Sequence, residues 1–338
     1  GSETGSYIVK TDFSGNTVSK QMLPYNYDVI KFKHSADNRT YMILTEHEIA
    51  NRENIQTDQW YICEVDSSCR LISKTKLDID NAKMPVVNDF CVNENSVSVL
   101  IDNFQYASNG RPSNEILLFD REGNKTETVR PETSNISCIF ESDGILYALC
   151  SSQEKTFTGR VDVEKHSITE ISRLDLNTNL INNISEGTGE YNLFLSFDDG
   201  IYGYRLSDNS LVEYVNWMDS DLEISQIKDF YVIDENRTGL SYFSNADNKV
   251  ELRYNIFSRV DDETLKNIQN RSLINIAFIN EPDIVIRDFF REYNITSEEY
   301  RVHIDDYSKY SDSDNIFRLS SHFDSELLQG NIPDIIFA

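Results

Sequence analysis

The sequence predicts a mainly β protein: an irregular β-propeller of five or six four-stranded blades, followed by a partial α/β lobe with the order β-α-β-α-β. Two observations lead to this prediction. From residue 6 to about residue 260, short runs of alternating apolar and polar residues are joined by turns, as in half-buried strands. From residue 272 onward, apolar runs of strand length alternate with amphipathic stretches of helix length.

A recurring hairpin turn sets the period of the predicted blades. It consists of an apolar residue, an aspartate, two or three further residues and then glycine or a substitute. A period in the forties to fifties with four strands is typical of a propeller blade. The last predicted sheet lacks an outer strand after Ile256, and the pair Tyr7 to Leu23 either fills this gap or remains from a sixth blade. The aspartates that mark the turn are Asp12, Asp66, Asp120 and Asp162, which lie 54, 54 and 42 residues apart.

The C-terminal segment predicts three strands and two helices. Strands are expected at 272–279, 300–304 and 333–338, and helices after Asn280 and over 315–329. Strands joined by helices of this length are almost always parallel. The predicted domains are therefore a propeller over 6–262, a polar linker over 263–271 and a partial lobe over 272–338.

Four pieces of this segment carry a resemblance to a known family. They are Ile276-Ala-Phe-Ile, Phe289-Phe-Arg-Glu-Tyr-Asn294, Tyr300-Arg-Val-His-Ile-Asp-Asp-Tyr-Ser308 and Gly330-Asn-Ile-Pro-Asp-Ile-Ile336. Their order resembles the first part of the bacterial extracellular solute-binding proteins of family 1, the lipoproteins of ABC importers. The resemblance covers roughly the last fifth of the chain. Family members continue beyond this part to complete two lobes, so we expect a truncated solute-binding domain.

The resemblance implies a function. It implies a non-catalytic protein, not an enzyme, that binds a small-molecule solute, a saccharide, and delivers it to an ABC transporter permease. It also implies an extracellular lipoprotein anchored to the cell membrane. Because the incomplete lobe exposes a sheet edge, self-association through that edge is a further expectation.

The geometry of a parallel sheet selects candidate ligand-binding residues. Ligands of open α/β sheets bind at the carboxyl ends of the strands. This rule selects Asn280 and Glu281 after the first strand, and Asp306 and Tyr307 after the second. A tyrosine ring can stack on a sugar, and the polar side chains can bond hydroxyl groups. The alternative is structural: a helix cap at Asn280 and a packed tyrosine at Tyr307.

Composition and missing motifs exclude several other functions. A formal charge of −26, from 31 basic and 57 acidic residues, argues against nucleic acid or anionic lipid as the main partner. The sequence has no phosphate-binding loop and no serine nucleophile elbow. Its five cysteines and five histidines lack metal-ligand spacing, so no catalytic residue, metal or cofactor is predicted. Cys63 and Cys69 flank a turn and either pair or remain free, buried thiols.

Two alternative functions remain open. In the first, the propeller itself binds a surface protein or a polysaccharide through its loops. In the second, the propeller is a glycoside hydrolase that uses two carboxylates. Asp198 with Asp199, Asp219 with Asp221, and Asp305 with Asp306 are the candidate pairs, although aspartate is also a common turn residue.

Overall fold

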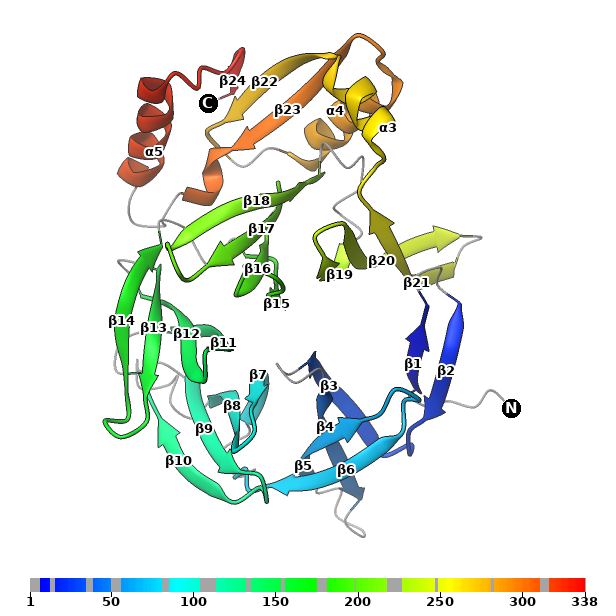
Figure 1. Ribbon diagram of the computed structural model, residues 1–338, viewed down its shortest axis with the longest axis vertical. Coiled ribbons are helices and arrows are strands. Elements are labelled where there is room, and N and C mark those ends of the chain that lie inside the picture. Colours follow the sequence, from blue (N-terminus) through cyan, green and yellow to red (C-terminus); the bar gives the residue numbers. More distant parts are fainter. Residues whose placement is uncertain are drawn as a thin grey trace. The chain divides into compact units, whose positions relative to one another are not determined.

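The computed structural model has a mainly β, propeller-like fold in which five small antiparallel sheets correspond to blades (Figure 1). It comprises two compact units, Gly1–Ser152 with Phe157–Ser172, and Gln153–Thr156 with Arg173–Ala338. The structure describes residues 7–12, 16–34, 39–49, 56–80, 85–103, 114–131, 135–152, 156–174, 181–197, 199–217, 227–246, 249–280, 283–310 and 316–337.

The first unit holds a hairpin and three four-stranded blades. The hairpin is β1 (Tyr7–Thr11) with β2 (Thr17–Met22). Within each blade the strands pair in chain order, as in a propeller blade. Blade 1 is β3 (Tyr27–His34), β4 (Thr40–Ile49), β5 (Gln56–Val65) and β6 (Leu71–Leu77). Blade 2 is β7 (Pro85–Val92), β8 (Ser96–Asn103), β9 (Asn114–Asp120) and β10 (Lys125–Val129). Blade 3 is β11 (Asn135–Ser142), β12 (Ile145–Ser151), β13 (Thr156–Asp162) and β14 (Ser167–Leu174).

The second unit begins with two further blades. Blade 4 is β15 (Asn183–Glu186), β16 (Leu193–Ser196), β17 (Gly200–Arg205) and β18 (Ser210–Asn216). Blade 5 has three strands, β19 (Ile227–Asp234), β20 (Arg237–Ala246) and β21 (Lys249–Ser258). The predicted blade repeat is thus confirmed, with five blades. The last sheet lacks a fourth strand among the described residues, while β1 and β2 pair with each other in a sheet of their own.

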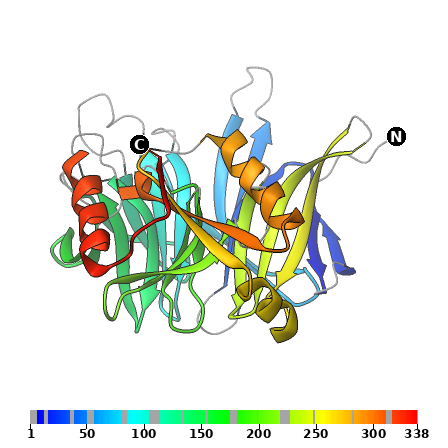
Figure 2. The same cartoon turned by 90° about the horizontal axis from the view of Figure 1, so that it is seen from above.

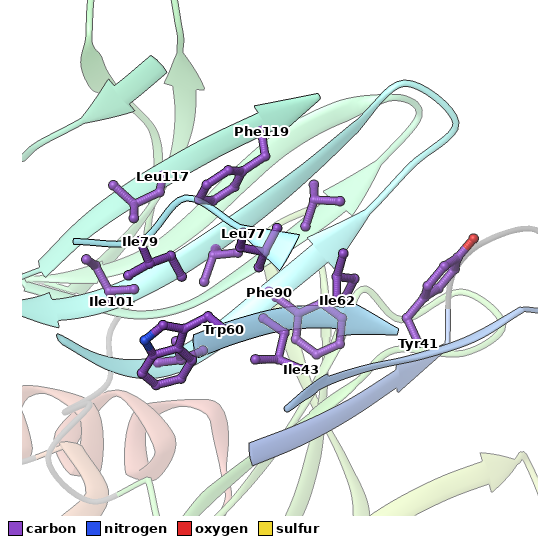
Figure 3. Packing of buried hydrophobic residues seen from close by; sticks show 13 residues of the cluster. Tyr41, Ile43, Trp60, Ile62, Leu77, Ile79, Phe90, Ile101, Leu117 and Phe119 are labelled. Atoms are coloured by element: carbon purple, nitrogen blue, oxygen red, sulfur yellow. The ribbon is translucent and has the colours of Figure 1, made fainter. Parts of the chain in front are cut away.

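Packing between neighbouring blades provides the core of the first unit. Figure 3 shows Trp60 and Ile43 of blade 1 facing Phe90 and Leu117 of blade 2, all of them buried. A similar cluster joins blades 2 and 3. All five cysteines lie buried and none forms a disulfide, so Cys63 and Cys69 are not bonded to each other. In the described parts of the chain, every helix is too short or too polar to cross a membrane.

The predicted hairpin turn joins the third and fourth strands of a blade. Asp66 Oδ1 accepts a hydrogen bond from the backbone N–H of Arg70 at 2.9 Å, and Asp120 Oδ1 accepts one from Asn124 at 2.8 Å. The backbone then enters the left-handed region, with φ of 85° at Gly123 and 64° at Cys69. Glycine adopts this conformation without a steric cost. The aspartate therefore fixes each turn, and the residue three positions later completes it.

Gly123 and Gly144 form a matched pair for testing this turn. Both have positive φ, but a Cβ atom at Gly123 would lie 2.0 Å from the carbonyl oxygen of Lys76, whereas Gly144 has open space. We expect Gly144→Ala to cost about 1–2 kcal/mol for the left-handed backbone. Gly123→Ala should cost about 3 kcal/mol, because the backbone must also move. Urea unfolding of both variants measures the difference, and equal losses would contradict the close approach.

A buried charge cluster joins the first strands of blades 1, 2 and 3. Asp89 on β7 lies 2.9 Å from Lys31 Nζ and 3.0 Å from Lys33 Nζ, both of which come from β3. Asp89 Oδ2 also accepts from the backbone N–H of Ile139 on β11 at 2.9 Å, and Lys33 donates to the carbonyl of Ile139 at 3.2 Å. Each of the three strands has a register shift next to these residues. Such bulges redirect side chains, so the repeated bulge brings the charges together.

Replacing Asp89 tests how much this cluster contributes to the free energy of unfolding. Burial alone would raise the pKa of Asp89, but the charges of Lys33 and Lys31 outweigh it and hold the pKa below its usual value. Asp89→Asn should cost about 3–5 kcal/mol at pH 7, because it leaves the buried ammonium group of Lys33 without its counter-ion. The stabilisation is present above the unfolded pKa of about 3.9 and is lost as pH falls through the folded value.

Unfolding free energies of wild type and Asp89→Asn between pH 7 and pH 2 check this prediction. The difference between the two should shrink as the solution becomes more acidic. Glu122→Gln, in an exposed turn, serves as the control and should stay within about 0.5 kcal/mol of wild type. A difference that is independent of pH would contradict an ionised Asp89.

The second unit ends in a small parallel sheet with helices. Helix α3 (Asp262–Gln269) is followed by β22 (Ser272–Phe278), α4 (Ile284–Thr296), β23 (Tyr300–Asp306), the 3-10 turn η4 (Tyr307–Tyr310), α5 (Ile316–Gln329) and β24 (Ile335–Phe337). Strand β22 pairs in parallel with both others, in the order β23-β22-β24. Side chains of α4 pack on Ile276 and Val302, whereas Phe323 of α5 packs near Ala277 on the other face. Figure 2 shows the ribbons of α4 and α5 beside the strands.

This segment has the predicted order of strands and helices, and α3 occupies most of the stretch predicted as a linker. The structure does not show that the segment is a lobe of a solute-binding protein. That interpretation and the domain limits at 262 and 272 stay predictions.

Candidate functional site

The candidate site lies where β22 and β23 end, and the structure brings some of the predicted residues to it. Asp306 is the last residue of β23, and Tyr307 begins η4 directly after it. Asn280 follows β22 and is exposed, and Glu281 falls outside the described residues. Asp306 and Tyr307 are both buried. Ligand binding by the four residues stays a prediction.

Asp306 is held in place by two donors. Arg287 of α4 lies with its Nη2 atom 2.6 Å from Asp306 Oδ2, and the backbone N–H of Ser308 donates to Oδ1 at 2.9 Å. Burial raises the pKa of Asp306; hydrogen bonding by the side chain of Ser308 and the Arg287 charge oppose this, while the charge of Asp199 adds to it. The net shift is upward. A carboxyl group of this kind gives up its proton less readily than an ordinary aspartate.

Blade 4 contributes a second carboxylate and a tyrosine. Tyr202 donates its hydroxyl proton to Asp199 Oδ2 at 2.8 Å, and both residues are buried. Burial, together with the charges of Asp199 and Glu213, raises the pKa of Tyr202, so the phenol stays protonated. Asp199 and Asp306 are thus two carboxylates of the same unit whose charges influence each other.

The tight turn between β16 and β17 positions Asp199. Phe197 and Gly200 exchange backbone hydrogen bonds, and Trp217 donates its indole N–H to the carbonyl of Phe197 at 3.0 Å. A Cβ atom at Gly200 would lie 2.2 Å from the carbonyl oxygen of Val215, so this position requires glycine. Asp199 is thus followed by a residue whose backbone is fixed by hydrogen bonds and by a close approach to β18.

Aromatic rings lie next to the carboxylates. Tyr307 packs edge-on against Phe323, with ring centroids 5.0 Å apart. The half-buried rings of Tyr310 and His322 stack on each other at 3.7 Å. Tyr310 also lies close enough to affect the Tyr202 hydroxyl. The rings of Tyr310 and His322 are thus half-buried and stacked on each other, whereas Tyr307 is largely covered.

Sequence reasoning missed Arg287, Tyr202, Tyr310 and His322. Tyr310 follows the predicted end of its strand by only a few residues. The rule that ligands bind at the carboxyl ends of parallel strands could therefore have included it. Tyr202 lies in another sheet, and nothing in its own sequence surroundings points to Asp306. Among the described residues, no cluster of histidine, cysteine and acidic side chains is arranged to hold a metal ion.

Comparison with known proteins gives no relative by sequence, since no family model and no curated protein matches. Solved structures match weakly. A "putative 6-phosphogluconolactonase" from Bacteroides uniformis is 11% identical, with 73% of this chain and 90% of that chain covered and a TM-score of 0.35. A luciferin-regenerating enzyme is 9% identical, with 68% and 91% covered and a TM-score of 0.40. Prolyl oligopeptidase B from Galerina marginata is 12% identical, with 86% and 47% covered and a TM-score of 0.37.

These matches correct one prediction. We predicted that the chain is not an enzyme, and the similar structures include proteins that are named as enzymes. That prediction is contradicted and is not kept. The comparisons also give no support to the solute-binding family. At these identities and scores the matches carry no argument about which reaction or ligand belongs to this chain.

The raised pKa of Asp306 gives a pH test of the site. Its folded pKa lies above its unfolded value, so its contribution to stability is complete below the unfolded pKa and is lost as pH rises through the folded one. Asn resembles the protonated form. Asp306→Asn should therefore gain stability relative to wild type between about pH 4 and pH 7. Thermal unfolding across this range measures the trend, and a trend in the same direction as that of Asp89→Asn would contradict it.

Proposed function

We propose that the protein binds a neutral saccharide at the carboxyl end of β23. The observation that carries the proposal is the grouping of fixed carboxylates, an arginine and half-buried rings at the edge of a parallel sheet. Asp306 and Arg287 hydrogen-bond hydroxyl groups, and Tyr310 with His322 provides the stacking surface. Binding at the strand ends of an open sheet is the usual arrangement in α/β folds.

The chemistry of the cluster favours a neutral sugar over an anionic solute. Sugar hydroxyls both donate and accept hydrogen bonds, and the site offers the carboxylates of Asp199 and Asp306 as acceptors beside the guanidinium of Arg287 as donor. Aromatic rings suit the apolar faces of sugar rings. The site contains two carboxylates and one arginine, so its charged groups carry no net positive charge. The net charge of −26 on the whole chain also repels anions over a longer range.

A wider role extends this proposal. We infer that the saccharide is captured outside the cell for an ABC importer, by a lipoprotein whose partner is the importer's permease. The support is the Gly330 to Ile336 sequence together with the β-α-β-α-β order of the segment. Mass spectrometry of the native protein tests this role: a lipid at the N-terminus agrees with it, and an unmodified cytosolic protein contradicts it.

A saccharide titration tests the proposed site. We expect one class of neutral mono- or oligosaccharide to bind in calorimetry, and Tyr310→Ala to weaken binding at least about tenfold through loss of stacking. Tyr310→Phe keeps the ring and should retain most of the affinity. Tyr25→Ala is the control, since Tyr25 is 82% exposed and lies in the other unit.

Two other outcomes of this titration are informative. Equal binding of a sugar to wild type and Tyr310→Ala would indicate that the binding site lies in the blades. This result would agree with a propeller that binds polysaccharide. Shorter products, separated by chromatography, would identify a glycoside hydrolase; loss of that activity in Asp306→Asn and Asp199→Asn would assign it to these carboxylates. No binding by any sugar would contradict the proposal.

A further inference from the structure

One face of blade 1 carries a cage of side chains around a lysine. The Lys74 ammonium lies 3.8 Å from the ring centroid of Tyr61 and 4.4 Å from that of Tyr27. It also contacts Glu46 Oε2 at 2.7 Å and the Tyr27 hydroxyl at 2.5 Å. We call Tyr27, Glu46 and Tyr61 the tyrosine cage. Two rings and a carboxylate around a cation are the elements of sites that recognise alkylammonium groups.

Strand register builds the cage. Tyr27 of β3 pairs with Glu46 of β4, and Cys63 of β5 pairs with Lys74 of β6. Alternate residues of a strand share a face, so Tyr61 lies on the same face as Cys63 and beside Lys74. All four strands of the blade therefore contribute to one side of one sheet, and the cage belongs to a rigid element.

The walls of the cage have supports of their own. Tyr61 donates its hydroxyl proton to Gln59 Oε1 at 3.0 Å, and Asn26 donates to Glu46 Oε1 at 3.4 Å. Tyr27 packs against the apolar cluster between blade 1 and the β1–β2 hairpin. These contacts do not involve Lys74. Each wall of the cage is therefore also held by a contact that does not involve Lys74.

We propose that the tyrosine cage is a binding site for a methylated ammonium cation, and that such a cation binds by displacing Lys74. The lysine is a weak occupant, because its side chain is 27% exposed, sits on a flexible stem and pairs with a partly exposed carboxylate. A methylated ammonium needs no hydrogen-bond partner and presents polarised methyl groups to both rings. The net charge of −26 also concentrates cations near the surface.

Titration with tetramethylammonium chloride, followed by NMR at constant ionic strength, tests the proposal. We expect wild type to bind the probe, and Lys74→Ala to bind it about tenfold more tightly because no occupant has to leave. Adding Tyr61→Leu to Lys74→Ala should abolish the gain, and Glu46→Gln should reduce it. Lys125→Ala is the control, since Lys125 is an exposed lysine of β10 in another blade.

Each outcome bears on the proposal. Equal binding by wild type and Lys74→Ala, or binding that survives Tyr61→Leu, would show general attraction of cations to an acidic surface and would overturn it. Absence of binding in both would overturn it as well. Binding by Lys74→Ala alone would overturn the displacement of Lys74. Melting temperatures of all variants establish that each is folded, and the saccharide titration above is independent of this site.

Discussion

Asp89 is the residue on which the first unit depends most, because its carboxylate, on β7, binds groups from both β3 and β11. It neutralises Lys31 and Lys33 from β3 and accepts the backbone N–H of Ile139 on β11, while Lys33 bonds the carbonyl of the same residue. First strands of neighbouring blades are sheet edges, whose backbone groups lack strand partners. Side chains from the next blade supply the missing hydrogen bonds here, and the apolar clusters between blades then close around them.

Two of the buried aspartates, Asp89 and Asp306, show how the surroundings of a carboxyl group set its pKa. Asp89 faces two lysines, and their charges outweigh the cost of burial, so its charged form is favoured. Asp306 faces one arginine, but burial and the nearby Asp199 shift its pKa the other way. The first arrangement holds blades together. The second makes the Asp306 carboxyl a weaker acid next to the ring of Tyr307.

Part of the candidate site follows from the rule that ligands of open α/β sheets bind at the carboxyl ends of the strands. Asp306 and Tyr307 were predicted because they follow a strand of a parallel sheet, and that sheet is present. Their partners were not predictable in this way. Arg287 reaches Asp306 because α4 packs on β23, and Asp199 comes from a turn in a different sheet more than a hundred residues earlier. Contacts between separate elements depend on packing, which local sequence patterns do not encode.

The sequence by itself determined the blade repeat, its aspartate turns and the alternation of strands and helices near the end of the chain. These features are local: an aspartate bonds the backbone N–H groups a few residues ahead, and apolar spacing follows the period of a strand or a helix. Tertiary structure alone decided the Asp89 cluster and the enclosure of Lys74 by the tyrosine cage. Each of these joins side chains from different strands, whose register and bulges are set only when the sheets pack.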